Sequence, residues 1–243
     1  MAIPETHARF HRRRSFLRRL VQTPWKTEAL VWIGKLLPAA CFVCIHYGYP
    51  DLDDRISRWG ANFALLKDSA YLHRAITHVA VHVSDEHLWK NVISYIVAAC
   101  SFPSTSDIFS FYGVFFGGAL AGLFATNVEQ HRHRRDTAAK YSFGLGLVER
   151  IVLYAHKKWQ HRVEFCGASA AVYSLLCYNA AKRRQVSSAL SLLFAEILSS
   201  TLSSEYFPDG RGDGLGAQLM HVGHWAHAGG IVFGLCAGLL DSP

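Results

Sequence analysis

The chain has 243 residues, of which 51% are apolar, 13% aromatic and 18% charged, and its net charge is +7. Average soluble domains carry about 25% charged residues, and disordered chains carry high charge with few aromatic residues, so this composition excludes a disordered chain. The positive charges lie in the terminal arm and in connections between apolar stretches, a distribution that indicates no nucleic-acid partner.

The first segment, residues 1–28, is a basic arm that contains seven Lys or Arg residues and two Glu residues. A basic patch at a membrane surface accounts for this arm. Its Arg-rich composition also resembles a mitochondrial presequence.

Six apolar stretches follow the arm, and each is long enough to cross a bilayer, whose hydrocarbon core needs about 20 residues. The stretch 108–128 has no charged residue over 21 positions, and 217–240 has none over 24. A soluble all-α protein is the alternative, but its helices would carry a polar face, which 108–128 lacks. The predicted spans are 29–49, 84–102, 107–127, 165–181, 186–206 and 217–240. We therefore predict an all-α membrane protein with a six-transmembrane-helix domain over residues 29–242.

Two long polar connections separate these spans. We predict polar loops at 50–83 and at 128–164, the second with eight Lys or Arg residues. Within it, 144–159 combines a set of apolar residues with the basic residues Arg150, Lys157 and Lys158, a composition that is typical of an interfacial amphipathic helix.

Glycines recur at helical spacing in the third and sixth spans. Helices in lipid associate through close packing rather than through the hydrophobic effect, and small residues permit that approach. The pattern predicts that these two spans pack tightly. The glycines are Gly113, Gly117, Gly118 and Gly122 in the third span, and Gly230 and Gly234 in the sixth.

Two groups of residues could bind a metal, but their spacing gives little support for a metal site. Cys41 and Cys44 form a C-x-x-C pair without a second pair, so buried free thiols are the favoured interpretation over zinc. His221, His224 and His227 stand at i, i+3 and i+6, which spreads them over more than half of a helix circumference. We expect no metal and no cofactor. A transporter is a further alternative, but the chain shows none of the internal repeats that this class predicts.

Serine chemistry is the other possibility for the polar residues within the spans. Ser169 opens the fourth span among small neighbours, and a hydroxyl becomes a nucleophile when a base lies within hydrogen-bond reach. His227 lies near the entrance of the sixth span, so the two side chains would meet if these spans pack together. His87 and Asn91, one turn apart in the second span, would then donate hydrogen bonds to an oxyanion. Each of these motifs alone is weak evidence for catalysis, since serine is a common small spacer in packed membrane helices.

Together these motifs resemble the rhomboid family of intramembrane serine proteases. The stretch 74–91 is similar to the approach to the family's second span and ends in its H-x-x-x-N, here His87 and Asn91. Gly167-Ala-Ser169 resembles the G-x-S of the nucleophile motif. Tyr173 lies where the family places an aromatic ring against the catalytic histidine. Ala226-His227 with G-x-x-x-G resembles the motif of the sixth span.

The resemblance implies a multi-pass rhomboid bundle and acyl transfer by a Ser169/His227 dyad. His87 and Asn91 would hold the oxyanion, with Gly167 and Tyr173 in supporting roles. Implied partners are the lipid bilayer and transmembrane protein substrates, which enter from lipid, usually past the fifth span. The alternative is a catalytically inactive rhomboid-like protein that binds membrane clients.

Two departures from the family pattern accompany the resemblance. Position 170 is alanine where the family usually has glycine, and its added methyl is expected to crowd the oxyanion site. The 128–164 connection is also longer than expected. The implied location is the mitochondrial inner membrane or the secretory pathway and plasma membrane. Mitochondrial rhomboids carry an extra span before the six-span core, for which residues 1–28 leave no room.

Overall fold

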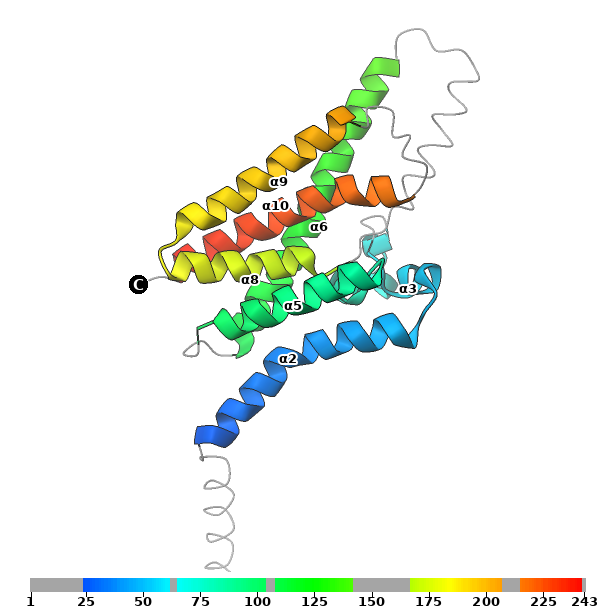
Figure 1. Ribbon diagram of the computed structural model, residues 1–243. Coiled ribbons are helices and arrows are strands. Elements are labelled where there is room, and N and C mark those ends of the chain that lie inside the picture. Colours follow the sequence, from blue (N-terminus) through cyan, green and yellow to red (C-terminus); the bar gives the residue numbers. More distant parts are fainter. Residues whose placement is uncertain (1–23, 62–64, 104–107, 142–166, 207–214, 242–243) are drawn as a thin grey trace, which may run out of the picture. The chain divides into compact units, whose positions relative to one another are not determined.

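The computed structural model describes residues 24–61, 65–103, 108–141, 167–206 and 215–241, and their regular structure is helical apart from an isolated bridge at Ala61 (Figure 1). The all-α prediction is therefore confirmed for these ranges. The long helices are α2 (Pro24–Gly48), α5 (Asp85–Ser101), α6 (Ile108–Tyr141), α8 (Ser169–Lys182), α9 (Val186–Tyr206) and α10 (Leu215–Leu240).

Each predicted span coincides with one of these helices. Among the described residues, two segments have the length and apolarity of a membrane span, Glu28–Gly48 and Ile108–Glu129. Helix α8 has 14 residues, which corresponds to about 21 Å at 1.5 Å per residue and is shorter than a bilayer core of about 30 Å. The count of six spans stays a prediction.

Helix α2 contains Pro38 in its interior, where proline removes a backbone hydrogen bond. The chain divides at this point into two compact units, residues 1–37 and 38–243. In the first unit, the Lys35 ammonium lies 5.1 Å from the centre of the Trp32 ring. The predicted boundary between arm and membrane domain at residue 28 stays a prediction, and residues 1–23 lie outside the described part.

The connection 50–83 contains short helices, so its prediction as a loop is corrected. Local capping explains part of this order. The Asp51 carboxylate accepts a hydrogen bond from the backbone N–H of Asp53 at 2.9 Å, which satisfies a free donor at the helix start. The short elements are α3 (Leu52–Trp59), η1 (Leu65–Lys67), η2 (Ser69–Tyr71), α4 (Arg74–Thr77) and η3 (His78–Ala80).

The second predicted loop is corrected at its start, because α6 continues to Tyr141. Residues 123–141 contain neither glycine nor proline, so no residue in the stretch ends the helix at the point where hydropathy falls. Hydropathy marks where a helix leaves an apolar environment, which is not where it stops. The predicted interfacial helix at 144–159 lies outside the described residues.

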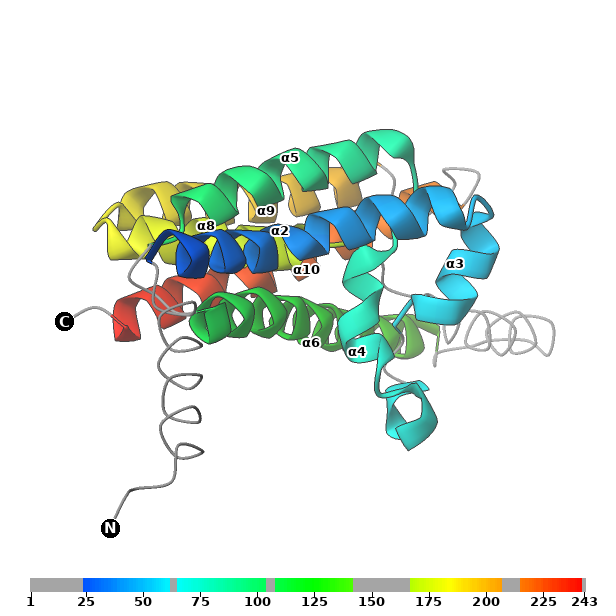
Figure 2. The same ribbon diagram turned by 90° about the horizontal axis from the view of Figure 1, so that it is seen from below.

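Within residues 38–243, helices α6, α8 and α10 pack against one another, with α5 and α9 also in contact with α8 (Figures 1 and 2). The predicted packing of the third and sixth spans is confirmed. A β-carbon built on Gly229 would lie 2.5 Å from the Ala121 carbonyl oxygen, and one on Gly122 would lie 2.8 Å from the Ala226 oxygen.

Helix α8 is the third member of this contact. It runs parallel to α10, because three glycines of α10, each four residues after the last, meet successive turns of α8. A β-carbon on any of them would lie within 2.8 Å of a backbone oxygen of α8. The pairs are Gly230 with Ala170, Gly234 with Ser174, and Gly238 with Tyr178.

Buried polar side chains tie the same helices together. The Ser174 hydroxyl donates to the Val114 carbonyl of α6 at 2.9 Å, and the Asn179 amide donates to the Ala98 carbonyl of α5 at 2.9 Å. In an apolar environment such groups need a partner, and bonds between helices supply it. Sequence reasoning missed both residues.

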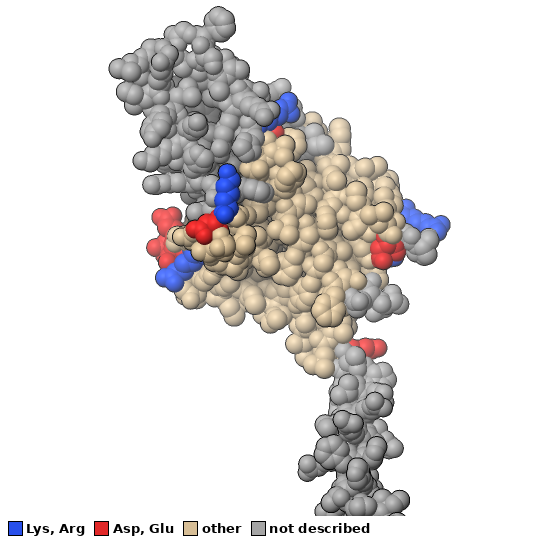
Figure 3. Space-filling view, turned by 180° about the vertical axis from the view of Figure 1, so that it is seen from behind, with Lys and Arg blue, Asp and Glu red and all other residues tan. Residues whose placement is uncertain are grey.

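Large apolar side chains are exposed on the outer surface. The face shown in Figure 3 is uncharged across its centre, with Lys, Arg, Asp and Glu side chains at its margins. The predicted burial of Cys41 and Cys44 is wrong, because both are exposed free thiols. Cys100 and Cys236 are exposed as well, whereas Cys177 is buried. In a membrane protein the outward positions face lipid, so an apolar thiol is compatible with exposure.

A charged network joins the connection to two helices. Arg55 is 4% exposed and donates to the His46 ring at Nδ1 and to the His46 carbonyl. Because Nδ1 accepts, Nε2 carries the proton, and it donates to the Asp85 carboxylate at 2.7 Å. These bonds fix α3 and the first turn of α5 to the end of α2, and so position the start of α5 for the site described next.

Candidate active site

Ser169 is the first residue of α8 and is partly exposed. The turn before it depends on Gly167, whose φ of +106° favours glycine. The Gly167 N–H donates to the His78 carbonyl at 3.0 Å, which fastens this turn to the connection before α5. The sequence therefore places a serine at a helix N-terminus, where backbone N–H groups have no acceptor within the helix.

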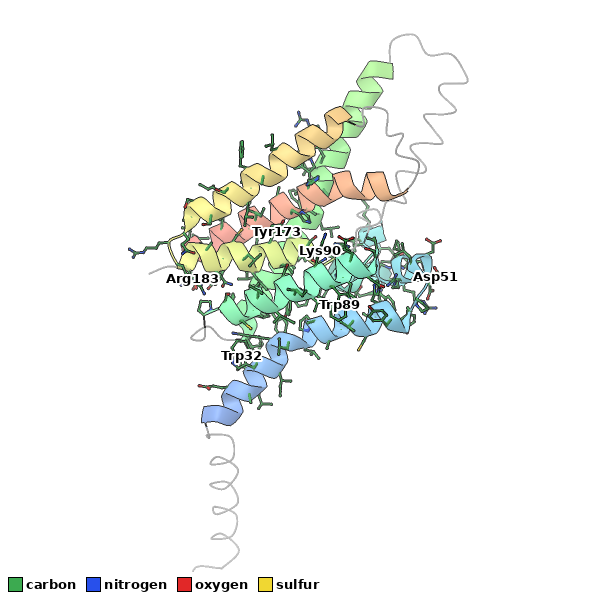
Figure 4. The ribbon with its side chains drawn as sticks, in the orientation of Figure 1. Trp32, Asp51, Trp89, Lys90, Tyr173 and Arg183 are labelled. Atoms are coloured by element: carbon green, nitrogen blue, oxygen red, sulfur yellow. The ribbon has the colours of Figure 1, made fainter. Side chains whose placement is uncertain are left out.

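His227 lies on α10 one turn before Gly230, which meets Ala170 of α8. The ring centres of His227 and Tyr173 are 4.7 Å apart, with 42° between the planes. Tyr173 lies on α8 beside α10 (Figure 4) and follows Ser169 by four residues, so the two share one face of α8. The structure thus brings His227 to the face of α8 that carries Ser169.

His87 lies in the first turn of α5 with one ring edge toward the Gly167 turn. A β-carbon on Gly167 would lie 2.9 Å from His87 Cε1 and 3.4 Å from Nε2. Asn91 is 5% exposed, and its Nδ2 donates to the His87 carbonyl at 2.9 Å. An amide nitrogen carries two protons, so Asn91 retains a second donor.

Ala170 is turned away from the space that the sequence analysis expected it to crowd. A β-carbon built on Gly122 of α6 would lie 2.6 Å from the Ala170 Cβ, so the alanine methyl occupies the notch that Gly122 leaves. Ala170 is 7% exposed. The expectation of a crowded oxyanion site is therefore corrected: the extra methyl fills the contact between α6 and α8.

Two further histidines of the connection belong to this region and were not singled out as site residues. His78 is buried and its Nδ1 lies 3.1 Å from the Arg74 carbonyl. Burial lowers the pKa of His78 to about 4. His82 is fully buried, and burial, with a smaller contribution from His87, lowers its pKa to about 3. Both rings are therefore neutral at pH 7. His78 and His82 stand four residues apart, shortly before His87. This spacing was the sequence signal that could have identified them as residues near the site.

The three histidines of the metal alternative are only partly described. No group of three His, Cys, Asp or Glu side chains is arranged for a metal within the described part of the chain, and the side chain of His221 lies outside that part. The ring centres of His224 and His227 are 6.3 Å apart. Asp241 follows the last residue of α10, where it accepts a hydrogen bond from Tyr178 and pairs with Lys182 at 3.0 Å. Its carboxylate thus joins the ends of α8 and α10.

The comparisons with known proteins agree with these motifs. The family model for the rhomboid domain matches residues 69–243, which include α5, the Gly167 turn, α8 and α10. No curated protein and no solved structure gives a significant match. The chain belongs to the rhomboid family, and its apolar helices and family membership make it an integral membrane protein.

Proposed function

We propose that this rhomboid-family chain is an intramembrane serine endopeptidase that cleaves transmembrane segments with a dyad of Ser169 and His227. The supporting observation is the contact between the His227 and Tyr173 rings, one turn from Ser169 on α8. A serine hydroxyl needs an adjacent base to become a nucleophile, and imidazole supplies one near neutral pH.

The proposed reaction is acyl transfer in two steps. His227 accepts the hydroxyl proton while Ser169 Oγ bonds to the scissile carbonyl carbon. The tetrahedral intermediate collapses, the C–N bond breaks, and His227 gives its proton to the leaving amine. Water then attacks the acyl ester and passes a proton to His227. The bond between the acyl carbon and Ser169 Oγ breaks, His227 returns its proton to Oγ, and the acid is released.

Three donors surround the position of the developing oxyanion in this proposal. The backbone N–H of Ser169 lies at the start of α8, where the helix dipole is positive. His87 and the second amide proton of Asn91 would donate from α5. Removal of one such donor typically lowers kcat by about 10²–10³-fold.

The chemistry needs only groups of the protein, so we propose no metal and no cofactor. The proposed partners are the bilayer and transmembrane protein substrates, with no nucleic acid. For the location we retain the mitochondrial inner membrane and the secretory pathway or plasma membrane. Protease protection of a tagged N-terminus in isolated organelles distinguishes them.

The test uses the full chain in liposomes with a transmembrane reporter. Ser169→Ala and His227→Ala should each lower cleavage by at least about 10³-fold, and a fluorophosphonate should label wild type but not Ser169→Ala. Ser57→Ala is the matched control, because Ser57 is exposed on α3, outside the predicted spans, and its hydroxyl donates to the Asp54 carbonyl of its own helix. Full activity of Ser169→Ala would refute the protease. A wild type that neither cleaves nor labels but co-purifies with membrane proteins would instead identify a client-binding homologue.

A further inference from the structure

His82 and His87 form a pair of imidazoles at the entry to α5. Their ring centres are 5.3 Å apart and the rings are inclined at 64°. His82 is fully buried, and its other neighbour is the Phe42 ring at 5.3 Å. The pair therefore lies between the hydrophobic core and the Gly167 turn.

The hydrogen bond of His82 defines its tautomer. Its Nδ1 lies 3.3 Å from the Ala80 carbonyl oxygen, and a carbonyl oxygen only accepts, so Nδ1 carries the proton. The ring is neutral, so Nε2 presents a lone pair. This Nε2 is buried and has no hydrogen-bond partner among the described residues.

His87 presents the complementary requirement. Its Nδ1 is also buried and lacks a partner within the described part of the chain, while its Nε2 edge faces Gly167. If His87 is to donate toward the oxyanion, a neutral ring must carry its proton on Nε2, and Nδ1 then presents a lone pair. Two neighbouring rings thus each carry a buried acceptor without a partner among the described residues.

We propose that one water molecule donates one hydrogen bond to His82 Nε2 and one to His87 Nδ1, so that His82 is a positioning residue that holds His87 in the tautomer able to donate a hydrogen bond to the oxyanion. The inference rests on the proposed protease function. Two hydrogen bonds of about 2.8 Å span about 4.5–5.5 Å between the two nitrogens. Rings whose centres lie 5.3 Å apart and whose planes are inclined at 64° allow a nitrogen separation in that range. Buried waters of this kind satisfy otherwise unpaired polar atoms.

A direct bond between the rings would have the opposite consequence. It would require a proton on His87 Nδ1, and Nε2 would then be a bare acceptor unable to donate to an oxyanion. The tautomer of His87 therefore distinguishes the bridge from the direct bond.

The decisive measurement is ¹⁵N solid-state NMR of the full chain in liposomes, with ¹⁵N-labelled histidine and His87 assigned by its loss in His87→Phe. Wild type should show a protonated Nε2 and an unprotonated, hydrogen-bonded Nδ1. His82→Phe, which keeps a ring but removes the acceptor, should give a mixture of tautomers. A protonated Nδ1 in wild type, or an unchanged His87 in His82→Phe, would overturn the proposal.

Kinetics supply the second readout. If the donating tautomer falls to about one tenth of the population, kcat falls about tenfold with KM unchanged. His82→Gln, whose amide oxygen takes the place of Nε2, should recover most of kcat. His82→Phe should have no further effect in a His87→Ala background. Equal losses in His82→Phe and His82→Gln, with lowered melting temperatures, would show a structural role only. A wild type without activity would refute the protease, whereas the NMR result decides the tautomer independently.

Discussion

Gly230→Ala tests whether the α8–α10 contact holds the dyad together. The added β-carbon would lie 2.1 Å from the Ala170 carbonyl oxygen, 2.8 Å from its carbonyl carbon and 3.0 Å from its Cα. Non-bonded heavy atoms prefer separations of about 3.5 Å. All three atoms belong to a helix backbone, which cannot rotate aside as a side chain would. The two helices must therefore separate by roughly 1 Å at this point.

Ser169 directly precedes Ala170 on α8 and His227 lies one turn before Gly230 on α10, so the separation reaches both residues directly. A displacement of about 1 Å at reacting groups can lower the rate about 10²-fold, and overpacking of a well-packed contact typically costs about 1–3 kcal/mol. We expect both losses in Gly230→Ala, measured as kcat for a transmembrane reporter in liposomes and as thermal unfolding in detergent.

Gly223→Ala is the matched control on the same helix. Beyond the neighbouring backbone of its own helix, no described atom lies within 4 Å of a β-carbon built there. Alanine favours a helix over glycine by about 1 kcal/mol. The control should retain wild-type activity and equal or greater stability. Wild-type activity and stability in Gly230→Ala would refute the argument that this close approach positions the dyad.

Two further predictions concern the turn before α8 and the end of α10. In Gly167→Ala, an alanine would have to adopt an unfavourable positive φ, and its β-carbon would lie 2.9 Å from His87 Cε1. Fluorophosphonate labelling of this variant should therefore be about tenfold slower or more. An unchanged labelling rate would contradict the close approach of His87 to Gly167. Hydrogen bonds from Tyr178 and Lys182 lower the pKa of Asp241 below its ordinary 3.8, so the ionised carboxylate stabilises the fold above that pH, and the contribution is lost as the pH falls through the lowered pKa. Melting temperatures of wild type and Asp241→Asn should therefore differ at pH 7 and approach each other below pH 3.8, and a difference that persists at still lower pH would refute this sign.

Much of the fold was readable from sequence because it rests on local properties. Runs of apolar residues predicted where the long helices lie, since burial in lipid requires a continuous hydrogen-bonded helix. Glycine spacing predicted the approach of the third and sixth spans, and Gly229 against Ala121 confirms it. Hydropathy did not predict the end of α6, because this helix continues through polar residues to Tyr141.

The candidate site was predicted as a list of residue types, and its geometry was not. The motif around Ser169 and the H-x-x-x-N of α5 are local patterns, so the sequence by itself determined the family, the helices and the residues with nucleophile, base and donor chemistry. Which face each side chain occupies depends on contacts between helices far apart in the chain. Only the tertiary structure shows that the Ala170 methyl packs against Gly122 and that the ring centres of Tyr173 and His227 are 4.7 Å apart. The close packing of helix backbones determines where these side chains lie, because a shift by the width of one methyl group changes which side chains are in contact.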